Sequence, residues 1–444
     1  MFYYGNKELI MRGVLVFTII VLFVFPAMKA DAEEIALDVE TAVSLALQNN
    51  LGLQTDRIDL EIKERAKQTA WNEFLPSIDA GAGLTRSVVN QGGASSVSGS
   101  TPWSVSANIR TSLPLSLSGR YSIQDAKLSF DEEAISLEDA EKQLVRDVKK
   151  AFFNLLLLTE KIRLTEQNIA TAQKRYDQAK TSYEYGLESE LTLLGALVTL
   201  ENLKPDLERI RVTSEIADME LKQMLGFDSD SGLTFTGSIE PNIRTFDVED
   251  LIEEHLETRP DIAAIMKDIE ALEIQKKITR LDVYTPLLSL SYSYVAGLND
   301  PFQSGAATVR GTNTFGISLS YPIDGLIPGS SGNVDIKDMD DSIKKAQIEL
   351  AEARQLAEIE IESTVLRLDN SSKASRALEQ NVILAQKVYD LTEKEYSAGE
   401  GELLKVEDAF DDLQKAKLSV LEERYNYISG LFDLEYELNT ELDI

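Results

Sequence analysis

The chemistry open to this sequence would have to come from carboxylates, because other catalytic side chains are scarce. The chain has 75 acidic residues, a single histidine at His255 and no cysteine. Cysteine-based zinc sites, disulfides, thiol nucleophiles and the usual histidine-dependent catalytic pairs are therefore excluded. Close carboxylate pairs are unavoidable in so acidic a chain and are typical of solvated helix surfaces. We therefore expect no catalysis, no metal site and no cofactor.

The formal net charge of −31 excludes one class of partner. Binding of nucleic acid needs clustered lysine and arginine side chains to neutralise phosphates. A charge of this sign suits a soluble surface, and it equally suits a lumen that attracts cations.

The first 32 residues resemble a secretory signal peptide. Lys7 and Arg12 precede an apolar run over residues 13–25, and Ala30-Asp31-Ala32 offers a cleavage site, predicted after Ala32. The alternative is a membrane anchor, but a bilayer crossing needs about 20 apolar residues. No later stretch approaches that length, so the mature chain would have to enter a membrane as β-strands.

The second half of the chain repeats the first, which predicts a duplicated structural unit over residues 33–240 and 241–444. Four positions align at a constant offset without a gap: Tyr176, Tyr183, Gly186 and Ala196 correspond to Tyr389, Tyr396, Gly399 and Ala409. Each unit is expected to contain a helix, a β-hairpin and a long helical hairpin. The predicted β-hairpins cover residues 77–115 and 287–322.

The predicted strands alternate apolar residues with serine, glycine, threonine and asparagine. Their connections, near residues 90–101 and 297–312, are rich in glycine, serine and asparagine. The pattern fits half-buried hairpins in a soluble sheet, and it also fits transmembrane strands with a wet inner face. Four strands cannot close a barrel, so the membrane interpretation requires several chains: two would supply eight strands and three would supply twelve.

The remaining residues predict long coiled-coil helices. Ile162, Ile169, Tyr176 and Tyr183 recur every seven residues, with Leu158, Thr165, Ala172 and Ala179 at the second seam position. Helices over residues 122–184 and 335–397 would each be roughly 90 Å long. Both end at a turn that carries glycine, near residues 186 and 399, and Pro205 is expected to kink or restart the returning helix.

Two short motifs at corresponding places resemble a known family. Ala46-Leu47-Gln48-Asn49-Asn50 and Arg259-Pro260-Asp261-Ile262 are similar to motifs of the TolC-like outer membrane efflux and secretion family. The resemblance implies a mainly helical fold with a β contribution. It implies a homotrimer with a twelve-stranded barrel in outer-membrane lipid and an α-helical tunnel in the periplasm. It also implies a passive exit duct, gated at its periplasmic tip, for a tripartite efflux pump or type I secretion system, with a periplasmic adaptor and an inner-membrane pump as partners.

The resemblance also assigns roles to residues of the two tips. Gly186, Leu187 and Gly399 fall where family members contact the adaptor, Tyr396 where a tyrosine helps to close the tip, and Asp408 on an acidic ring at the constriction. Thr192 and Lys405 stand where the family often has aspartate, so a lysine ring beside the aspartate ring would alter ion preference. Glutamates near both turns are either solvated charge or a match for a basic adaptor.

An alternative function remains at this stage. Long acidic helices would equally suit an exported coiled-coil protein that tethers envelope layers without forming a pore. That alternative does not need two pairs of alternating strands with small polar residues on one face. An enzyme is not expected, because no residue constellation supports one.

Overall fold

The computed structural model describes residues 35–86, 103–229, 231–299 and 308–442. The predicted signal peptide and the first strand connection lie outside the described residues, as does part of the second connection. The elements of the first half are β1 (Ile35–Leu37), α2 (Val39–Asn49), α3 (Leu51–Thr69), η1 (Ala70–Phe74), β2 (Ser77–Arg86), β3 (Trp103–Leu115), α4 (Gly119–Glu184), α5 (Glu190–Met224) and β4 (Leu233–Phe235). Those of the second half are α6 (Val248–His255), η2 (Leu256–Thr258), α7 (Pro260–Tyr284), β5 (Leu287–Asn299), β6 (Thr308–Ser320), η3 (Asp324–Leu326), α8 (Ser331–Ser397) and α9 (Leu403–Leu438).

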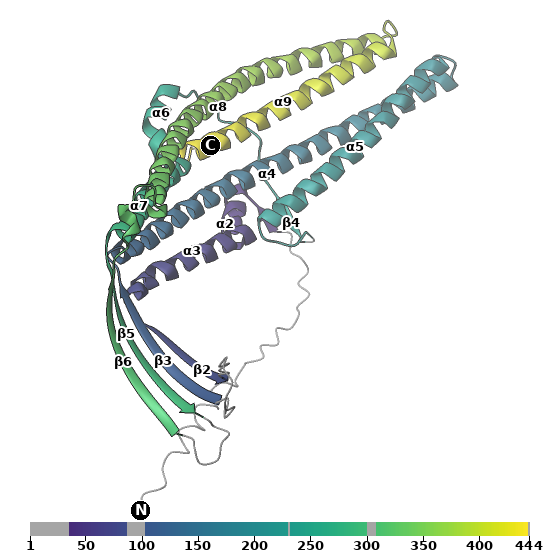
Figure 1. The fold of residues 1–444 in the computed structure, drawn as a ribbon. Helices are drawn as coiled ribbons and strands as arrows, with labels where there is room; N and C mark the ends of the chain where they lie inside the picture. Colours follow the sequence, from purple (N-terminus) through teal and green to yellow (C-terminus); the bar gives the residue numbers. More distant parts are fainter. Residues whose placement is uncertain (1–34, 87–102, 230, 300–307, 443–444) are drawn as a thin grey trace, which may run out of the picture.

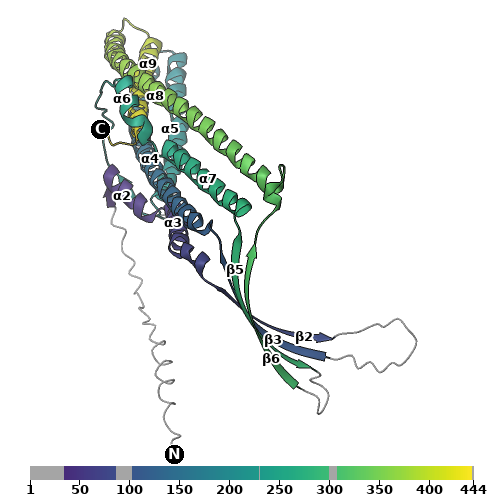
Figure 2. The ribbon, with the colours of Figure 1, turned by 60° about the vertical axis from the view of Figure 1, so that its left-hand side comes forward.

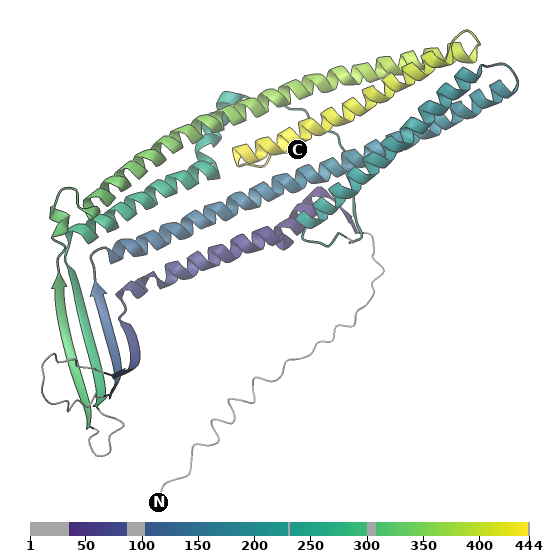
Figure 3. The ribbon, with the colours of Figure 1, turned by 45° about the vertical axis from the view of Figure 1, so that its right-hand side comes forward.

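The molecule is an elongated set of helices with a curved sheet at one end (Figure 1). The hairpins α4–α5 and α8–α9 run away from the sheet to two turns at the far end (Figure 3). Helices α3 and α7 pack beside the parts of α4 and α8 that lie nearer the sheet. Figure 2 shows β5 leading out of α7 and β6 leading back into α8. Helix α4 has 66 residues and α8 has 67, so each is about 100 Å long.

Among the described residues, the larger sheet has the antiparallel order β2-β3-β5-β6. Its register places apolar residues opposite apolar residues, as in the pairs Ala80–Ile109, Ile109–Tyr294, Leu113–Leu290 and Leu290–Ile317. The other face carries small polar residues, as in the pairs Gly81–Asn108, Ser112–Ser291 and Ser291–Gly316. The apolar face is uncovered: the side chains of Phe315, Ile317 and Leu319 are 85, 76 and 70% exposed.

The long helices bury one of the two predicted seams of α4 more completely than the other. Leu158, Thr165, Ala172 and Ala179 are all buried, whereas Ile162, Ile169 and Tyr176 are half-buried and Tyr183 is exposed. Larger apolar clusters lie midway along the helices, one in each half. The first surrounds Phe152 and Leu221 and includes residues of α2 and β1, and the second surrounds Ile361 and Leu431.

Helix α5 continues through Pro205, so the restart that was one of two expected outcomes does not occur. Proline removes the hydrogen bond to the carbonyl of Glu201. Both residues are exposed, so water can solvate that carbonyl, which offsets part of the cost of the proline. Within the described part of the chain, none of the helices combines the length and apolar composition that a bilayer crossing would need.

The first helix of each half is divided, which the sequence did not predict. Asn50 separates α2 from α3: its side-chain oxygen accepts from the amide of Leu53 at 3.1 Å, and its amide group donates to the carbonyl of Met224 at 3.0 Å. In the second half Arg259 and Pro260 mark the division before α7. The motifs that carried the family resemblance therefore mark helix breaks that contact the far end of the returning helix.

The ends of α5 and α9 adopt the same left-handed cap. Gly226 has φ 75° and Asn439 has φ 55°, and each follows a fully buried leucine, Leu225 or Leu438. Glycine and asparagine are the residues that most readily adopt this conformation at a helix end. In the first half the glycine lies directly against Asn49, while in the second half the side chain of Asn439 donates to the carbonyl of Thr258 at 2.9 Å.

Replacing Gly226 with alanine tests this close approach. A β-carbon there would lie 2.4 Å from the carbonyl oxygen of Asn49, and φ is 75°. Gly186→Ala is the matched control, because φ is 69° and no atom lies within 4 Å of its β-carbon position. The free energy of unfolding of the control should fall by about 1 kcal/mol, the cost of placing alanine in a left-handed conformation. That of Gly226→Ala should fall by clearly more. Equal shifts of Tm in detergent, followed by circular dichroism, would contradict the predicted clash.

Candidate functional site

The residues predicted at the tips lie on the two turns at the far ends of the hairpins. Residues 185–189 join α4 to α5, and residues 398–402 join α8 to α9. Gly186 and Gly399 have φ of 69° and 79°. At both turns the glycine amide and the next amide donate to carbonyls of the last helical turn at 2.8 to 3.0 Å, which caps the helix fully. Leu187, 78% exposed, is presented to solvent by this arrangement.

Tyr396, predicted to help close the tip, joins the two hairpins. Its phenol group donates to the Glu188 carboxylate at 3.2 Å, so α8 is linked to the turn between α4 and α5. The ring is half-buried beside a cluster of small and apolar side chains, with Ala179, Ala196 and Leu403 buried at its centre. The contact therefore combines a hydrogen bond with packing of the ring against apolar side chains.

The environment keeps this phenol protonated. Burial is the largest cause that raises the pKa of Tyr396, and the negative charges of Glu188 and Glu407 raise it further. A phenol with a raised pKa remains a hydrogen-bond donor throughout the physiological range.

The other predicted residues lie outside this contact. The amide of Thr192 donates to the hydroxyl oxygen of Ser189 at 3.2 Å, which places Thr192 in the N-terminal cap of α5. Lys405 and Asp408 are exposed on α9, about one turn apart. The structure therefore brings together Tyr396 and the 185–189 turn, while Lys405 and Asp408 remain on an open helix face.

A second link between the hairpins was not predicted. Arg175 of α4 is only 8% exposed, and its guanidinium donates to the hydroxyl of Tyr389 of α8 at 2.7 Å. The same guanidinium lies 4.4 Å from the ring centroid of Phe410 of α9, so it makes a cation–π contact as well. The sequence signal available for it was helical spacing, because Arg175 lies three residues after Ala172 and four before Ala179, two predicted seam residues.

Acidic residues of α9 surround this arginine. Burial raises the pKa of Glu407, the nearby Asp411 and Asp408 raise it further, and Arg175 opposes the rise. Burial also raises the pKa of Asp411, with Asp408 adding to the effect. The folded tip therefore favours the protonated form of both carboxyl groups relative to an unfolded chain.

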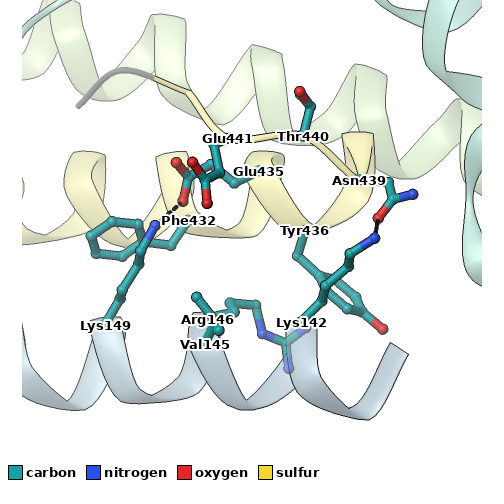
Figure 4. Close-up of a pocket in the computed structure, with 10 residues that line it drawn as sticks. All are labelled: Lys142, Val145, Arg146, Lys149, Phe432, Glu435, Tyr436, Asn439, Thr440 and Glu441. Carbon is teal, nitrogen blue, oxygen red and sulfur yellow. Dashed lines mark hydrogen bonds and ion pairs between the residues drawn. The ribbon is translucent and has the colours of Figure 1, made fainter. Parts of the chain in front are cut away.

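The described residues offer no group of three or more His, Cys, Asp or Glu side chains arranged to hold a metal ion. A cleft of about 140 Å³ lies between α4 and α9 (Figure 4). Its α9 residues belong to the C-terminal end of that helix, far from the tip turns. Its cations already have partners: Lys149 pairs with Glu435 at 2.7 Å, Lys142 bonds to Asn439, and Arg146 lies over the ring of Tyr436. This cleft is therefore part of the packed contact between the two halves, and its cationic side chains are already paired.

Comparison with known proteins identifies the fold. The profile described as "Outer membrane efflux protein" matches residues 42–227 and 251–435. TolC of Salmonella enteritidis is 23% identical over 341 residues, which cover 70% of this chain and 65% of that protein. TolC of Escherichia coli K12 is 22% identical over 342 residues, 70% of this chain and 66% of that protein. The chain thus matches slightly less than two thirds of the length of these relatives.

Solved structures are similar over nearly the whole chain. CusC, whose crystal structures concern folding and transmembrane channel formation, has a TM-score of 0.73 at 16% identity, covering 94% of this chain and 96% of that one. The Campylobacter jejuni CmeC outer membrane channel has a TM-score of 0.73 at 18% identity, covering 90% and 85%. The open state of the Neisseria gonorrhoeae MtrE outer membrane channel has 0.71 at 18%, covering 90% and 89%. The predicted mainly helical fold with a β contribution is confirmed.

Because folding raises the pKa of Glu407, the stability of the surrounding part of α9 should depend on pH. A carboxyl group whose pKa is raised by folding contributes stability that is complete below the ordinary range and is lost as pH rises through the raised value. Amide exchange over residues 403–411, corrected for intrinsic rates, should therefore become faster between pH 4 and 7. Glu407→Gln should slow exchange at pH 7 and weaken this pH dependence.

Glu400→Gln is the control, because Glu400 is exposed on the adjacent turn. Both variants remove one negative charge near the tip, but only Glu407→Gln removes a partly buried one. If both variants slow amide exchange equally, the total negative charge of the tip, rather than the burial of Glu407, controls its stability.

Proposed function

The chain belongs to the outer membrane efflux protein family, and we propose that three copies of it form a gated channel that serves as the exit duct of a tripartite efflux pump or type I secretion system. The protein is located in the outer membrane with a periplasmic extension, and like its family it is not an enzyme. The trimer, the gate and the partners are the content of the proposal.

The two-faced sheet is the observation that carries the proposal. All four strands present apolar side chains on one face and mainly serine, glycine, threonine and asparagine on the other. That division suits lipid outside and water inside. Strands β2 and β6 each have one neighbour in the described sheet, and open edges are not tolerated in hydrocarbon. Pairing of β6 with β2 of the next copy would close twelve strands from three chains.

The helices support assembly of the same kind. Uncovered apolar side chains form a stripe on α5, at Leu191, Leu194 and Val198, and another on α8, at Leu384, Val388 and Leu391. The two stripes belong to different hairpins, which lie side by side in one chain (Figure 3). In a ring, a hairpin of one copy would meet the other hairpin of the next copy, and the apolar stripes would be buried in a continuous tunnel wall.

We also propose that residues 33–240 and 241–444 are duplicated units behind a signal peptide of residues 1–32. Two matches to one family profile, over 42–227 and 251–435, support this division. The equivalent left-handed caps at Gly186 and Gly399, and again at Gly226 and Asn439, support it independently.

The tips are the proposed gate. Tyr396 holds the turn of the first hairpin through Glu188, and this link restrains the second hairpin at the free end. An adaptor that contacts Gly186, Leu187 and Gly399 more favourably in an untwisted arrangement would shift the population toward the open form. Energy would come from an inner-membrane pump. Exposed Lys405 and Asp408 would then influence which ions pass the constriction, while the amide of Thr192 bonds to Ser189, the residue that caps α5.

Light scattering of the detergent-extracted protein tests the assembly. After correction for bound detergent, we expect the mass of three chains of 49.3 kDa each, less any removed signal peptide. A monomer could not close a barrel from four strands, so a monomeric mass, or solubility without detergent, would leave the tethering protein without a pore as the better explanation.

Tyr396→Phe tests the gate in planar bilayers. The variant keeps the ring but removes the bond to Glu188, which is worth about 1 kcal/mol at a partly exposed site. We expect the ratio of conducting to closed states to rise roughly five-fold for each tip contact that is lost.

Tyr185→Phe is the control, because Tyr185 lies on the neighbouring turn and is 76% exposed. Its conductance should match that of the unmodified protein. If Tyr396→Phe behaves like the control, the tyrosine is not part of the gate; if the unmodified protein never conducts, the channel itself is refuted.

A further inference from the structure

The two halves join the sheet to the long helices differently. In the first half, residues 116–118 suffice between β3 and α4. In the second half, residues 321–330 lie between β6 and α8, and we name this segment the junction loop. The junction loop carries four uncovered apolar side chains: Tyr321, Ile323, Leu326 and Ile327 are 44, 68, 61 and 59% exposed. Exposed apolar side chains gathered on one short segment are typical of a surface that contacts a partner or lipid.

The junction loop is firmly held from its inner side. Gly325 is buried, and a β-carbon there would lie 2.5 Å from the carbonyl oxygen of Val283. The side-chain amide of Asn333 donates to the carbonyls of Gly325 and Ile327 at 2.8 and 2.9 Å. The hydroxyl of Tyr284 in turn donates to the side-chain oxygen of Asn333.

Much of the backbone of the junction loop is also satisfied internally. The amide of Leu326 donates to the carbonyl of Ile323 at 3.0 Å, and that of Ile327 donates to the carbonyl of Asp324 at 2.9 Å. These bonds hold the inner side of the loop, and its exposed side carries isoleucine and leucine side chains together with the carboxylate of Asp324. Apolar side chains beside a charged group suit the boundary between head groups and acyl chains, where the charge can stay among the head groups.

The alternation of apolar residues along β6 continues in the sequence of the junction loop. Phe315, Ile317 and Leu319 alternate along the strand on the face that is proposed to contact lipid. The same period of two extends to Tyr321 and Ile323 after the strand ends. Tyrosine is enriched where lipid head groups begin, because its ring is apolar and its hydroxyl is polar.

We propose that the junction loop lies in the lipid interface of the outer membrane's periplasmic leaflet, with Ile323, Leu326 and Ile327 inserted below the head groups. The loop acts as a monotopic anchor, of the kind whose apolar side chains sit about 5–10 Å into the boundary between head groups and acyl chains. It fixes the depth of the second half of each chain relative to the bilayer. The inference rests on the proposed function, because it requires the apolar face of the sheet to contact lipid.

The absence of cysteine from the sequence makes a labelling test direct. Leu326→Cys and Ile323→Cys would each carry a single nitroxide in the full-length protein, reconstituted in phosphatidylethanolamine–phosphatidylglycerol liposomes. Collision with oxygen, which partitions into lipid, is compared with collision with nickel(II) ethylenediaminediacetate, which stays in water. Phe315→Cys, 85% exposed on the sheet, is the lipid control, and Leu404→Cys, 64% exposed on α9, is the water control.

We expect the oxygen-to-nickel ratio at Leu326 and Ile323 to be several-fold above that at Leu404 and to approach that at Phe315. Ratios like that of Leu404, with Phe315 still in lipid, would overturn the anchor and leave the channel proposal intact. Immobile labels that neither reagent reaches would place the loop against the next copy, which also overturns the anchor. Water access at Phe315 itself would refute the proposed channel and the anchor with it.

Discussion

The hydrogen-bonding groups along the edges of the sheet impose the strictest condition on this molecule. Strands β2 and β6 each leave one row of backbone amides and carbonyls without a partner in the described chain. Water can satisfy such groups, but hydrocarbon cannot, and each unsatisfied group would cost several kcal/mol. A sheet with one apolar face and two open edges is therefore unstable alone in the setting its side chains require. In the proposed ring, pairing with other copies would remove both open edges.

The ends of the helices are capped by local chemistry that is nearly the same in both halves. Each long helix ends in a left-handed glycine cap, and each returning helix ends in a left-handed cap beside a buried leucine. The halves differ where they contact one another. Buried Arg175 and the phenol of Tyr396 connect the first hairpin to the second. On α9, the partly buried carboxyl group of Glu407 lies near Arg175. The scaffold is thus repetitive, while these contacts between the two hairpins have no counterpart in the repeat.

Strands and tips could be predicted from the sequence because their signals are local. Alternation along Leu288 to Tyr294 and the glycines at 186 and 399 depend on nearest neighbours only. The division at Asn50 could not be predicted, because it is stabilised by the carbonyl of Met224, 174 positions away. The restart expected at Pro205 does not occur, because α5 continues through it where water can solvate the exposed carbonyl of Glu201. The role proposed for Tyr396 came from the family resemblance, but its contact with Glu188 depends on how the two hairpins lie in space.

The central pairing of the sheet has a kinetic consequence. Strand β3 belongs to the first half and pairs with β5 of the second, so that Ile109 lies opposite Tyr294. A growing or translocating chain can form β2 and β3 early, but it cannot complete the sheet until most of the second half has followed. Contacts so distant in sequence form slowly, since a long loop must first be closed. The unfinished hairpin has an apolar face and exposed edges throughout that interval, which makes its protection from aggregation a requirement of its biogenesis.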